Sequence, residues 1–553
     1  MFQGKLELEI LKSKYNEEKK GLLHKIEEFP ISRKDTSGNQ TGTWRTLLPV
    51  FKEGVAPCTE ACPAHTHIPE YMSLVCEGKL TEALDIIRRE NPLPAVCGRV
   101  CPHFCEESCN RGEFDEQVSI RAVERFIGDY GLVIPHKKDT DNIEGKVAVV
   151  GSGPAGLSAA YFLARQGVVV DLYEREAKAG GLLRYGIPEY RLPRDVLDQE
   201  IENIFALGVN FLKERDIGPE ELPSLAREYD FVFFSPGLWG RNIPQWGYSG
   251  KAISSGLNIL KMIHKGKIPP LGHRVVVVGG GNTAMDVTRV LMRLGKEVTI
   301  VYRRTLAKAP AFADEIQEGI EERIQILERK LITRIEDQTD NSLMIEIQDA
   351  VKERDGKIVP DGEKTHRIVD SVVAAVGQVP EMSIEKDDKV FFGGDYETGE
   401  GTVVHAIASG KRGAFAILER MGVLNRDETD ESLRVADETP SRRIISYDQL
   451  NTFYFRKEKR LETKRLGVGK RVKDFLEIVA QASQDAVMAE SGRCFSCGTC
   501  TLCGVCWYFC PDACVITSKN GPQKVVFDLD FCKGCAICSV SCPRGCVVME
   551  EEQ

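Results

Sequence analysis

Cysteine is absent from the central part of this 553-residue chain, although the chain has 19 cysteines in all. Seven lie between Cys58 and Cys109, twelve lie between Cys494 and Cys546, and the long interval between these groups contains none. A flavin-dependent disulfide reductase needs a redox cysteine pair, so the central part does not belong to that class. Tight cysteine clusters indicate metal binding instead of a disulfide framework.

The chain also lacks long apolar runs and an excess of basic residues. No stretch approaches the ~20 apolar residues of a membrane-spanning helix, and the first residues contain no apolar signal-peptide core. The net charge of -10 argues against a nucleic-acid partner. The composition is that of a globular protein, and 553 residues are too many for one core. We expect a cytoplasmic location as the default.

One cysteine pattern, C-x2-C-x2-C-x3-C-P, occurs twice near the C-terminus, at residues 500–511 and 532–543. It is the signature of bacterial two-cluster ferredoxins, in which the fourth cysteine of each run binds the other cluster. We therefore assign one [4Fe–4S] cluster to Cys500, Cys503, Cys506 and Cys542, and another to Cys532, Cys535, Cys538 and Cys510. A zinc site is the alternative, but it does not require this repeated spacing. Cys514 and Cys546 are expected to pack as small hydrophobic residues.

The N-terminal cysteines are less regular. Cys58 and Cys62 form a C-x3-C-P motif, and CGRVCPHFCEESC supplies cysteines at positions 97, 101, 105 and 109. We expect a metal site here, although the spacing does not identify its ligands. Cys76 lies in an amphipathic pattern and is expected in the core of a helix.

The stretch KVAVVGSGPAGLSAAYFLARQGVVVDLYE predicts a strand, a glycine turn, a helix and a second strand. Gly151, Gly153 and Gly156 permit a tight turn and close approach of the backbone to a pyrophosphate at the helix N-terminus. Glu174 ends the second strand, where it can accept hydrogen bonds from ribose hydroxyls. The pattern predicts a Rossmann-type dinucleotide site.

The stretch RVVVVGGGNTAMDVTRVLMRLGKEVTIVYRR repeats the unit, with Gly279, Gly281 and Ala284 at its turn. Arg303 and Arg304 stand where the first unit has an acid. Two cations at the ribose edge suit a 2′-phosphate and favour NADPH over NADH. The alternative is a solvated basic pair at a strand end.

A third segment, VFFGGDYETGEGTVVHAIASGKR, places Gly394 and Asp395 between an apolar strand and a helix beginning near Thr402. An aspartate at such a place can hold the ribityl chain and ring edge of a flavin. The motifs SPG (235–237) and AVG (375–377) mark strand ends where the chain would cross between two domains. We expect an α/β fold of two nested Rossmann-like domains, with a helical iron–sulfur domain before them and an α+β ferredoxin domain after them.

The chain resembles the glutamate synthase β-subunit family of FAD and iron–sulfur oxidoreductases over roughly residues 55–425. The markers are NPLPAVCGRVCPHFCEESCNRG, VAVVGSGPAGLSAA, GGLLRYGIPEYRLPRDVL, VVVVGGGNTAMD, VYRR and GGDYETGEGTVVHAIASGKR. The resemblance implies that FAD contacts Gly151, Ser152, Gly153, Pro154, Ala155, Gly156, Glu174, Gly181, Leu182, Arg191, Gly394, Asp395, Thr402 and Val403. It implies that NADPH contacts Gly279, Gly281, Asn282, Thr283, Ala284, Arg303 and Arg304, with Ala375, Val376 and Gly377 near the nicotinamide.

The resemblance also implies the ligands of an N-terminal cluster near the flavin, which are Cys62, Cys101, Cys105 and Glu124. Our second choice is Cys58, Cys62, Cys97 and Cys101. A further cluster of the family uses a leading C-x2-C together with positions matching Cys58 and Cys109, and this chain has no leading C-x2-C. We therefore predict one N-terminal cluster and two in the ferredoxin domain.

The segment MAESGRCFSCG, just before the ferredoxin motif, is similar to the missing leading segment. Cys494 and Cys497 would complete a cluster with Cys58 and Cys109 if the tail folds back. The interpretation that we favour from the sequence is that both thiols pack at the start of the ferredoxin domain.

The motifs divide the chain into seven parts. They are an N-terminal extension (1–50), an iron–sulfur domain (51–140), the first part of the FAD domain (141–256), the NAD(P)H domain (257–380), the second part of the FAD domain (381–425), a connector of mostly helical pattern (426–490) and the ferredoxin domain (491–553). For residues 1–50 the hypothesis is partner docking.

These features predict an oxidoreductase subunit that passes electrons between NAD(P)H, FAD and [4Fe–4S] clusters to or from another redox subunit or a ferredoxin-like carrier. A flavin accepts hydride and releases single electrons, so it connects the two kinds of chemistry. No proton-transfer residue is predicted, since hydride transfer requires stacked rings more than an acid or base. The alternatives are an electron-bifurcating flavin subunit of a ferredoxin:NAD(P) oxidoreductase or hydrogenase-type complex, and a non-catalytic electron-relay subunit.

Overall fold

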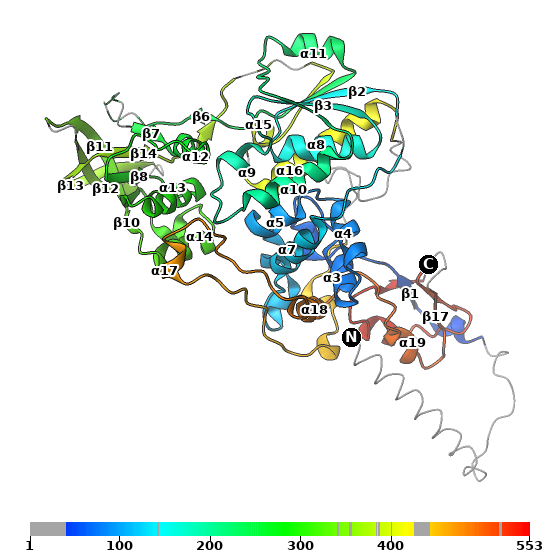
Figure 1. Cartoon of the computed structure of the whole chain (residues 1–553). Coiled ribbons are helices and arrows are strands. Elements are labelled where there is room, and N and C mark those ends of the chain that lie inside the picture. Colours follow the sequence, from blue (N-terminus) through cyan, green and yellow to red (C-terminus); the bar gives the residue numbers. More distant parts are fainter. Residues whose placement is uncertain are drawn as a thin grey trace.

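The computed structural model describes residues 40–552, apart from 141–142, 245, 247, 249, 251–252, 340–341, 353–356, 383, 385–386, 400, 425–442 and 519–522. Most of the N-terminal extension and part of the connector therefore lie outside the described residues. Four bodies are visible in Figure 1: two nucleotide-binding domains, a helical domain between them and the tail, and a small tail domain.

The first nucleotide-binding domain is built on a five-stranded parallel sheet of order β16-β5-β2-β3-β4. The strands are β2 (Lys146–Val150), β3 (Val169–Glu174), β4 (Asn210–Lys213), β5 (Phe231–Phe234) and β16 (Val390–Phe392). The helices are α8 (Pro154–Arg165), α9 (Gly181–Tyr185), α10 (Arg194–Phe205), α11 (Leu222–Glu228), α15 (Asp395–Thr398) and α16 (Val403–Arg420). The valines of β2 are buried, as expected of a parallel strand covered on both faces.

The second nucleotide-binding domain interrupts the first, because β16 returns to the first sheet after the whole second sheet has formed. Its parallel sheet has the order β10-β9-β8-β14-β7. The strands are β7 (Ile253–Ser255), β8 (Arg274–Val278), β9 (Glu297–Tyr302), β10 (Gln325–Glu328) and β14 (Ser371–Ala374), and the helices are α12 (Gly256–His264), α13 (Asn282–Arg293), η3 (Leu306–Lys308) and α14 (Ala313–Glu321). Two short antiparallel strands, β6 (Gly240–Arg241) and β15 (Gln378–Val379), pair where the chain crosses between the domains.

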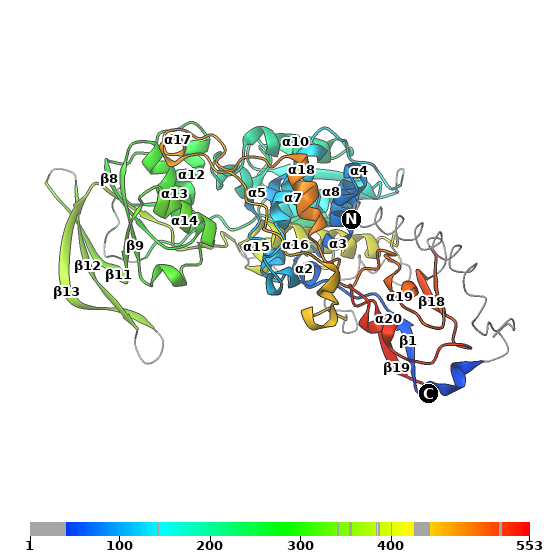
Figure 2. The ribbon, with the colours of Figure 1, turned by 90° about the horizontal axis from the view of Figure 1, so that it is seen from below.

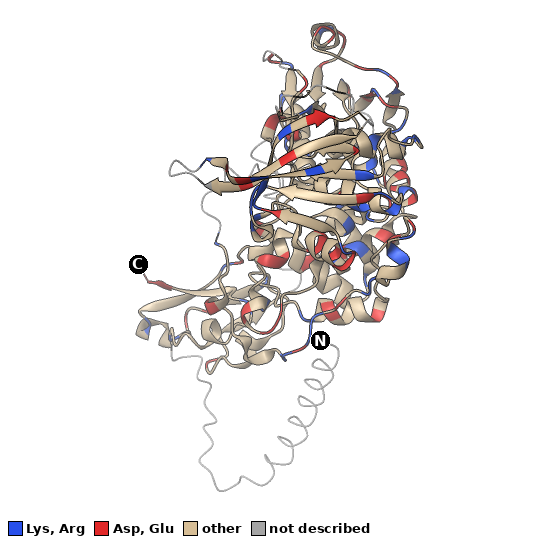
Figure 3. Ribbon diagram, turned by 90° about the vertical axis from the view of Figure 1, so that its left-hand side faces the viewer, with Lys and Arg blue, Asp and Glu red and all other residues tan. Residues whose placement is uncertain are grey.

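An antiparallel sheet that the sequence patterns do not reveal is inserted in the second domain. It consists of β11 (Lys330–Asp337), β12 (Leu343–Lys352) and β13 (Ile358–Val369). Figure 2 shows it at the outer end of the second domain, far from the tail domain. Figure 3 shows basic and acidic residues intermixed over the strands and helices of these domains.

The helical domain contains α2 (Pro57–Glu60), α3 (Ile68–Cys76), α4 (Leu80–Arg88), α5 (Pro94–Val100), α6 (Phe104–Glu107), η2 (Asn110–Glu113) and α7 (Ile120–Gly131). It is joined to the first nucleotide-binding domain by buried polar contacts. The carboxylate of Glu200, on α10, accepts hydrogen bonds from Ala95 N (2.8 Å) and Val96 N (3.0 Å) and so caps α5. Lys411, on α16, forms a buried ion pair with Glu90.

The tail domain has a ferredoxin-like arrangement of α19 (Val505–Tyr508), β17 (Val515–Thr517), β18 (Val525–Phe527), α20 (Ile537–Val540) and β19 (Val547–Glu551). Residues 40–51 belong to it physically, with η1 (Thr41–Trp44) followed by β1 (Leu47–Phe51), which pairs antiparallel with β19. A boundary at residue 50 therefore cuts through a strand.

The described part of the connector differs from expectation. Residues 443–490 form only short helices, η6 (Tyr447–Gln449), η7 (Thr452–Tyr454), α17 (Val468–Arg471) and the start of α18 (Gln484–Gly492), so the prediction of a mostly helical segment is wrong there. The physical reason is that its backbone bonds to the helical domain instead of to itself. Arg111 donates to the carbonyl of Arg456, for example, and Arg460 forms an ion pair with Glu106. In the described ranges, no helix is both long and apolar enough to cross a membrane.

Candidate functional site

The glycine turn of the first nucleotide-binding domain is shaped by close backbone contacts. Gly151 has φ +94°, and a Cβ atom there would lie 2.3 Å from the carbonyl oxygen of Ser235. At Gly156 a Cβ atom would lie 1.8 Å from the carbonyl oxygen of Gly151. At Gly153, by contrast, it would meet nothing within 4 Å. The turn therefore leaves open space at the N-terminus of α8, where a pyrophosphate binds in such folds.

Glu174 is held in place at the end of β3. One carboxylate oxygen accepts hydrogen bonds from Ser152 N (3.0 Å) and Ser152 Oγ (2.5 Å), and the other accepts one from Glu176 N (2.9 Å). The carboxylate is buried among protein atoms yet borders the cleft beside the turn. This fixed acceptor suits ribose hydroxyls.

A single cleft brings together nearly all the residues predicted to contact FAD. Its lining includes Gly151, Ser152, Gly153, Pro154, Ala155, Glu174, Gly181, Leu182, Arg191, Gly394, Asp395, Thr402 and Val403, whereas Gly156 lies behind the turn. Asn282, Thr283 and Gln378 of the second nucleotide-binding domain line the same cleft. FAD and a nicotinamide can therefore meet in this cleft, and the open space at Gly153 fits the pyrophosphate of FAD.

The cleft is closed on one side by the segment that leads into α16. Gly394 has φ +66°, and its N–H donates to Ser409 Oγ (2.9 Å). Thr402 caps α16, with its hydroxyl accepting from His405 N (3.4 Å). The N-terminus of this 18-residue helix thus borders the cleft, where its dipole favours electron-rich atoms of a ligand.

The second glycine turn repeats the first. A Cβ atom at Gly279 (φ +146°) would lie 2.1 Å from the carbonyl oxygen of Ala375, whereas at Gly281 the nearest atom would be 3.9 Å away. Ala284 is buried behind the turn, on α13. Ala375, Val376 and Gly377 follow β14, and Gln378 Nε2 donates to Thr283 Oγ1 (3.4 Å).

Arg303 and Arg304 lie exposed directly after β9. Among the described residues, neither guanidinium takes part in a side-chain hydrogen bond or an ion pair. Two uncompensated cations at this place fit an anionic group such as a 2′-phosphate.

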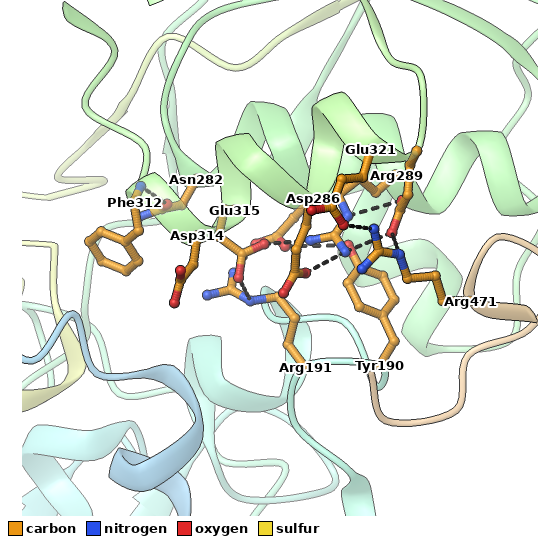
Figure 4. Close-up of polar contacts among 12 residues, drawn as sticks. Tyr190, Arg191, Asn282, Asp286, Arg289, Phe312, Asp314, Glu315, Glu321 and Arg471 are labelled. Carbon is orange, nitrogen blue, oxygen red and sulfur yellow. Dashed lines mark hydrogen bonds and ion pairs between the residues drawn. The ribbon is translucent and has the colours of Figure 1, made fainter. Parts of the chain in front are cut away.

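Arg191 has partners that the sequence does not indicate. Its guanidinium lies 2.8 Å from Asp286 and 2.7 Å from Glu315, both in the second nucleotide-binding domain (Figure 4). Tyr190 beside it packs against the guanidinium of Arg293, 4.2 Å from the ring centre. The marker GIPEYRLP thus joins the two nucleotide-binding domains at the cleft, and a contact between Arg191 and FAD remains a prediction.

The predicted N-terminal ligands lie together. Burial raises the pKa of Cys105, and the nearby Cys62, Cys101 and Glu124 raise it further. Helices α5 and α7 approach closely because Gly98 and Gly128 have no Cβ, and this places Glu124 opposite Cys101. Such crowding of buried thiols and a carboxylate favours a cationic group, and iron supplies one.

Two residues that sequence reasoning missed hold Glu124. Asn91 Nδ2 donates to Glu124 Oε1 (3.0 Å), and His103 Nε2 lies 3.3 Å from Glu124 Oε2. The backbone N–H of His103 also donates a hydrogen bond to Cys101 Sγ (3.5 Å). The marker NPLPAVCGRVCPHFC, which contains both residues, is the signal that could have identified them.

In the tail domain, two small cavities coincide with the two predicted clusters. One is lined by Cys500, Cys503, Cys506 and Cys542, and the other by Cys510, Cys532, Cys535 and Cys538. Each cavity is thus lined by the four thiols predicted for one cluster, three from one run and one from the other, as a pair of cubanes requires, and by one further cysteine, Cys514 or Cys546. Cys514 and Cys546 are buried beside them, and their N–H groups donate to Cys510 Sγ and Cys542 Sγ (both 3.3 Å).

The remaining cysteines lie in two places, on helices of the helical domain or where that domain meets the start of the tail. Cys76 lies on α3 and Cys97 is buried on α5, beside Glu124 and Cys101. Cys58 and Cys109 lie instead near Cys494 and Cys497. Over the described ranges, no group of three or more His, Cys, Asp or Glu side chains is arranged round a single metal ion. A zinc site needs four ligand atoms about 2.3 Å from one point, a tighter arrangement than the corners of a cubane.

Two family profiles match the chain. Residues 52–133 match dihydropyrimidine dehydrogenase domain II, 4Fe-4S cluster, and residues 145–404 match pyridine nucleotide-disulphide oxidoreductase. The second region contains no cysteine, so it has the fold of that class without its redox disulfide. The profiles support FAD, NADPH and [4Fe–4S] clusters as the cofactors.

Three relatives show the extent of the similarity. The NADPH-Fe(3+) oxidoreductase subunit beta of Geobacter sulfurreducens is 36% identical over 352 residues, which are 60% of this chain and 52% of the relative. The NADP(+)-dependent formate dehydrogenase subunit beta of Moorella thermoacetica is 34% identical over 512 residues, covering 80% and 70%. The glutamate synthase [NADPH] small chain of Escherichia coli is 30% identical over 420 residues, covering 66% and 89%.

This chain spans about half the length of the Geobacter relative. It covers most of the Moorella and Escherichia coli relatives. The nested domains, the shared cleft and these similarities agree. The chain belongs to the glutamate synthase β-subunit family of FAD- and iron–sulfur-containing oxidoreductases.

Proposed function

We propose that the chain is an NADPH-dependent oxidoreductase subunit that passes electrons between NADPH, FAD and iron–sulfur clusters, to or from a partner redox subunit or carrier protein. The observation that carries the proposal is the shared cleft, which is lined by the glycine turn of the first domain and by Thr283 and Gln378 of the second. When bound, FAD accepts a hydride and releases single electrons. The residues of the chain bind and orient the two ring systems.

The helical domain lies directly behind this cleft. Val100, the residue before Cys101, lines the cleft, and Cys101 belongs to the same hydrophobic core as Ala155 and Val403. The N-terminal cluster site thus adjoins the flavin site, so electrons have a short path from one to the other.

The tail domain offers an exit to a partner. Cys503 and Cys535 are exposed, so both tail sites open to the surface. We infer that a partner docks there, and the names of the relatives, subunit beta and small chain, support a multi-subunit assembly. We also infer a cytoplasmic location, since a reducing compartment preserves this many cysteine thiols.

Anaerobic rapid mixing with NADPH tests the proposal. We expect the flavin absorbance to bleach first and the electron paramagnetic resonance signals of reduced clusters to follow. A flavin that dithionite reduces but that neither NADPH nor NADH bleaches would show that the chain is only a relay.

A further inference from the structure

Four cysteines outside the sites described above come from opposite ends of the chain. Cys58 and Cys109 belong to the helical domain, and Cys494 and Cys497 lie at the start of the tail domain, before its two repeated cysteine motifs. Two hydrogen bonds bring the segments into contact. Asn110, next to Cys109, donates from Nδ2 to Cys497 Sγ (3.5 Å), and Gly54 N donates to the carbonyl of Gly498 (3.0 Å).

The four thiols share one buried environment. Cys58 is 7% exposed and Cys497 is 8% exposed, and both lie in the hydrophobic core that Cys109 and Cys494 border. Burial raises the pKa of Cys58, and the charges of Cys109, Cys494 and Cys497 raise it further. The side chains therefore lie near one another, and each of the four is a free thiol.

The loop that carries Cys494 and Cys497 is anchored on the helical domain directly before its first cysteine. Before it, Arg493 donates to the carbonyl of Glu116 (2.6 Å) and lies 3.1 Å from Asp115, while Arg111 donates to the carbonyl of Arg493 (2.6 Å). These guanidinium groups are buried.

Phe495, one of the two residues between the cysteines, adds an aromatic anchor. The ring of Phe495 contacts those of Phe114 and Phe455, with ring centres 5.7 and 4.5 Å apart. Arg544 of the tail domain donates to its carbonyl (2.8 Å). The C-x2-C is therefore held in a fixed position against Cys58 and Cys109.

We propose that Cys58, Cys109, Cys494 and Cys497 bind a fourth [4Fe–4S] cluster, assembled from the two ends of the chain. Four cysteine thiolates hold a [4Fe–4S] cluster, and C-x2-C is a spacing that recurs among such ligands. Ser496 N donates to Cys494 Sγ (3.4 Å) and Asn110 to Cys497 Sγ, as outer hydrogen bonds do at cluster sulfurs.

The site lies between the other cluster sites. Cys58 is near Cys105 of the N-terminal set, since its charge contributes to the raised pKa of that thiol. On the other side, Cys497 is three residues before Cys500, whose N–H donates to Glu53 Oε1 (2.8 Å). A cluster here connects the flavin-proximal site to the tail sites, so the four sites form one relay.

The test is metal and acid-labile sulfide analysis of the full-length, anaerobically purified holoprotein. We expect about sixteen irons per chain, four for each cubane. Cys494→Ala/Cys497→Ala should lose about four, and so should Cys58→Ala/Cys109→Ala. The decisive variant combines all four changes, which should lose no more than either pair, because the pairs share one cluster.

Cys76→Ala is the matched control and should keep every iron. Flavin content and the paramagnetic signals of the tail clusters report folding, and the milder Cys497→Ser is analysed in parallel. About twelve irons with one zinc in the wild-type protein would overturn the proposal in favour of a structural zinc site. A full iron count in the Cys494→Ala/Cys497→Ala variant would overturn it outright.

Discussion

Asn110 donates a hydrogen bond from its side-chain amide to the sulfur of Cys497 across 387 positions of sequence. A hydrogen bond to a cluster sulfur stabilises the reduced, more negative state. Asn110→Leu is therefore expected to make the reduction potential of the cluster at Cys497 more negative, leaving the others unchanged. Redox titration followed by electron paramagnetic resonance measures each potential.

Asn110 also donates to the carbonyl of Ile445 (2.8 Å), so part of any effect could be structural. Asn451→Leu is the control, because Asn451 Nδ2 donates to the carbonyl of Val540 (2.9 Å) in a comparable bond that reaches no cysteine. Equal shifts in both variants would contradict a role for Asn110 at the sulfur.

The second prediction concerns the contact between the nucleotide-binding domains. Arg191 and Asp286 are almost fully buried, with side chains 8% and 5% exposed. Arg191→Leu leaves the carboxylate without this cation, which is expected to cost about 3 kcal/mol of unfolding free energy. Chemical denaturation of the holoprotein measures the loss.

Arg191→Leu/Asp286→Leu should recover part of that stability, because it removes both charges, and Glu315 keeps its ion pair with Arg289 (2.6 Å). Flavin content reports on the separate prediction that Arg191 contacts FAD. Additive losses in the double variant would show that the two side chains do not stabilise each other.

The third prediction is nucleotide preference. Arg303→Glu with Arg304→Ala should weaken the binding of NADPH at least about ten-fold and that of NADH much less. The reason is that each charge-assisted contact to a 2′-phosphate contributes ~1.5–3 kcal/mol. Rates of flavin bleaching over a range of nucleotide concentrations give the dissociation constants for NADPH and for NADH. Arg227→Ala, an exposed arginine on α11, is the control. Equal losses for both nucleotides would rule out the phosphate contact.

The local patterns predicted those parts of the molecule that depend on short-range chemistry. Glycine turns and cysteine spacing specify how the nearby backbone must fold, and the turns at Gly153 and Gly281 and the two tail cavities lie where the sequence indicated. The inserted β11–β13 sheet was not predicted, because its strands carry no sequence motif. The ion-pair partners of Arg191 were not predicted, because Asp286 and Glu315 are distant from it in the sequence.

The docking of the tail segment on the helical domain was not predicted, for a related reason. Spacing within MAESGRCFSCG cannot show which surface the segment covers. Its docking depends on Arg111, Arg493 and Phe495, whose contacts join residues more than 340 positions apart. Such contacts are specified by the packed domains and not by the local chain.

The last prediction concerns the flavin-proximal cluster. Glu124 brings a carboxylate to three thiols, and a carboxylate is a harder ligand than a thiolate. Glu124→Ala should make this cluster labile, with about four irons lost on gel filtration, and should slow reduction of the tail clusters. NADPH-driven flavin bleaching should be unchanged, since the cleft does not include Glu124.

Glu124→Cys should keep the iron and shift the potential of one cluster only, because a fourth thiolate changes the charge on the cluster. Glu107→Ala, an exposed carboxylate on α6 of the same domain, controls for loss of charge and should change nothing. Cys97 is the competing ligand, since it is buried beside Glu124 and Cys101. If Glu124→Ala keeps its iron and its potential while Cys97→Ala loses about four irons, the fourth ligand of this cubane is Cys97.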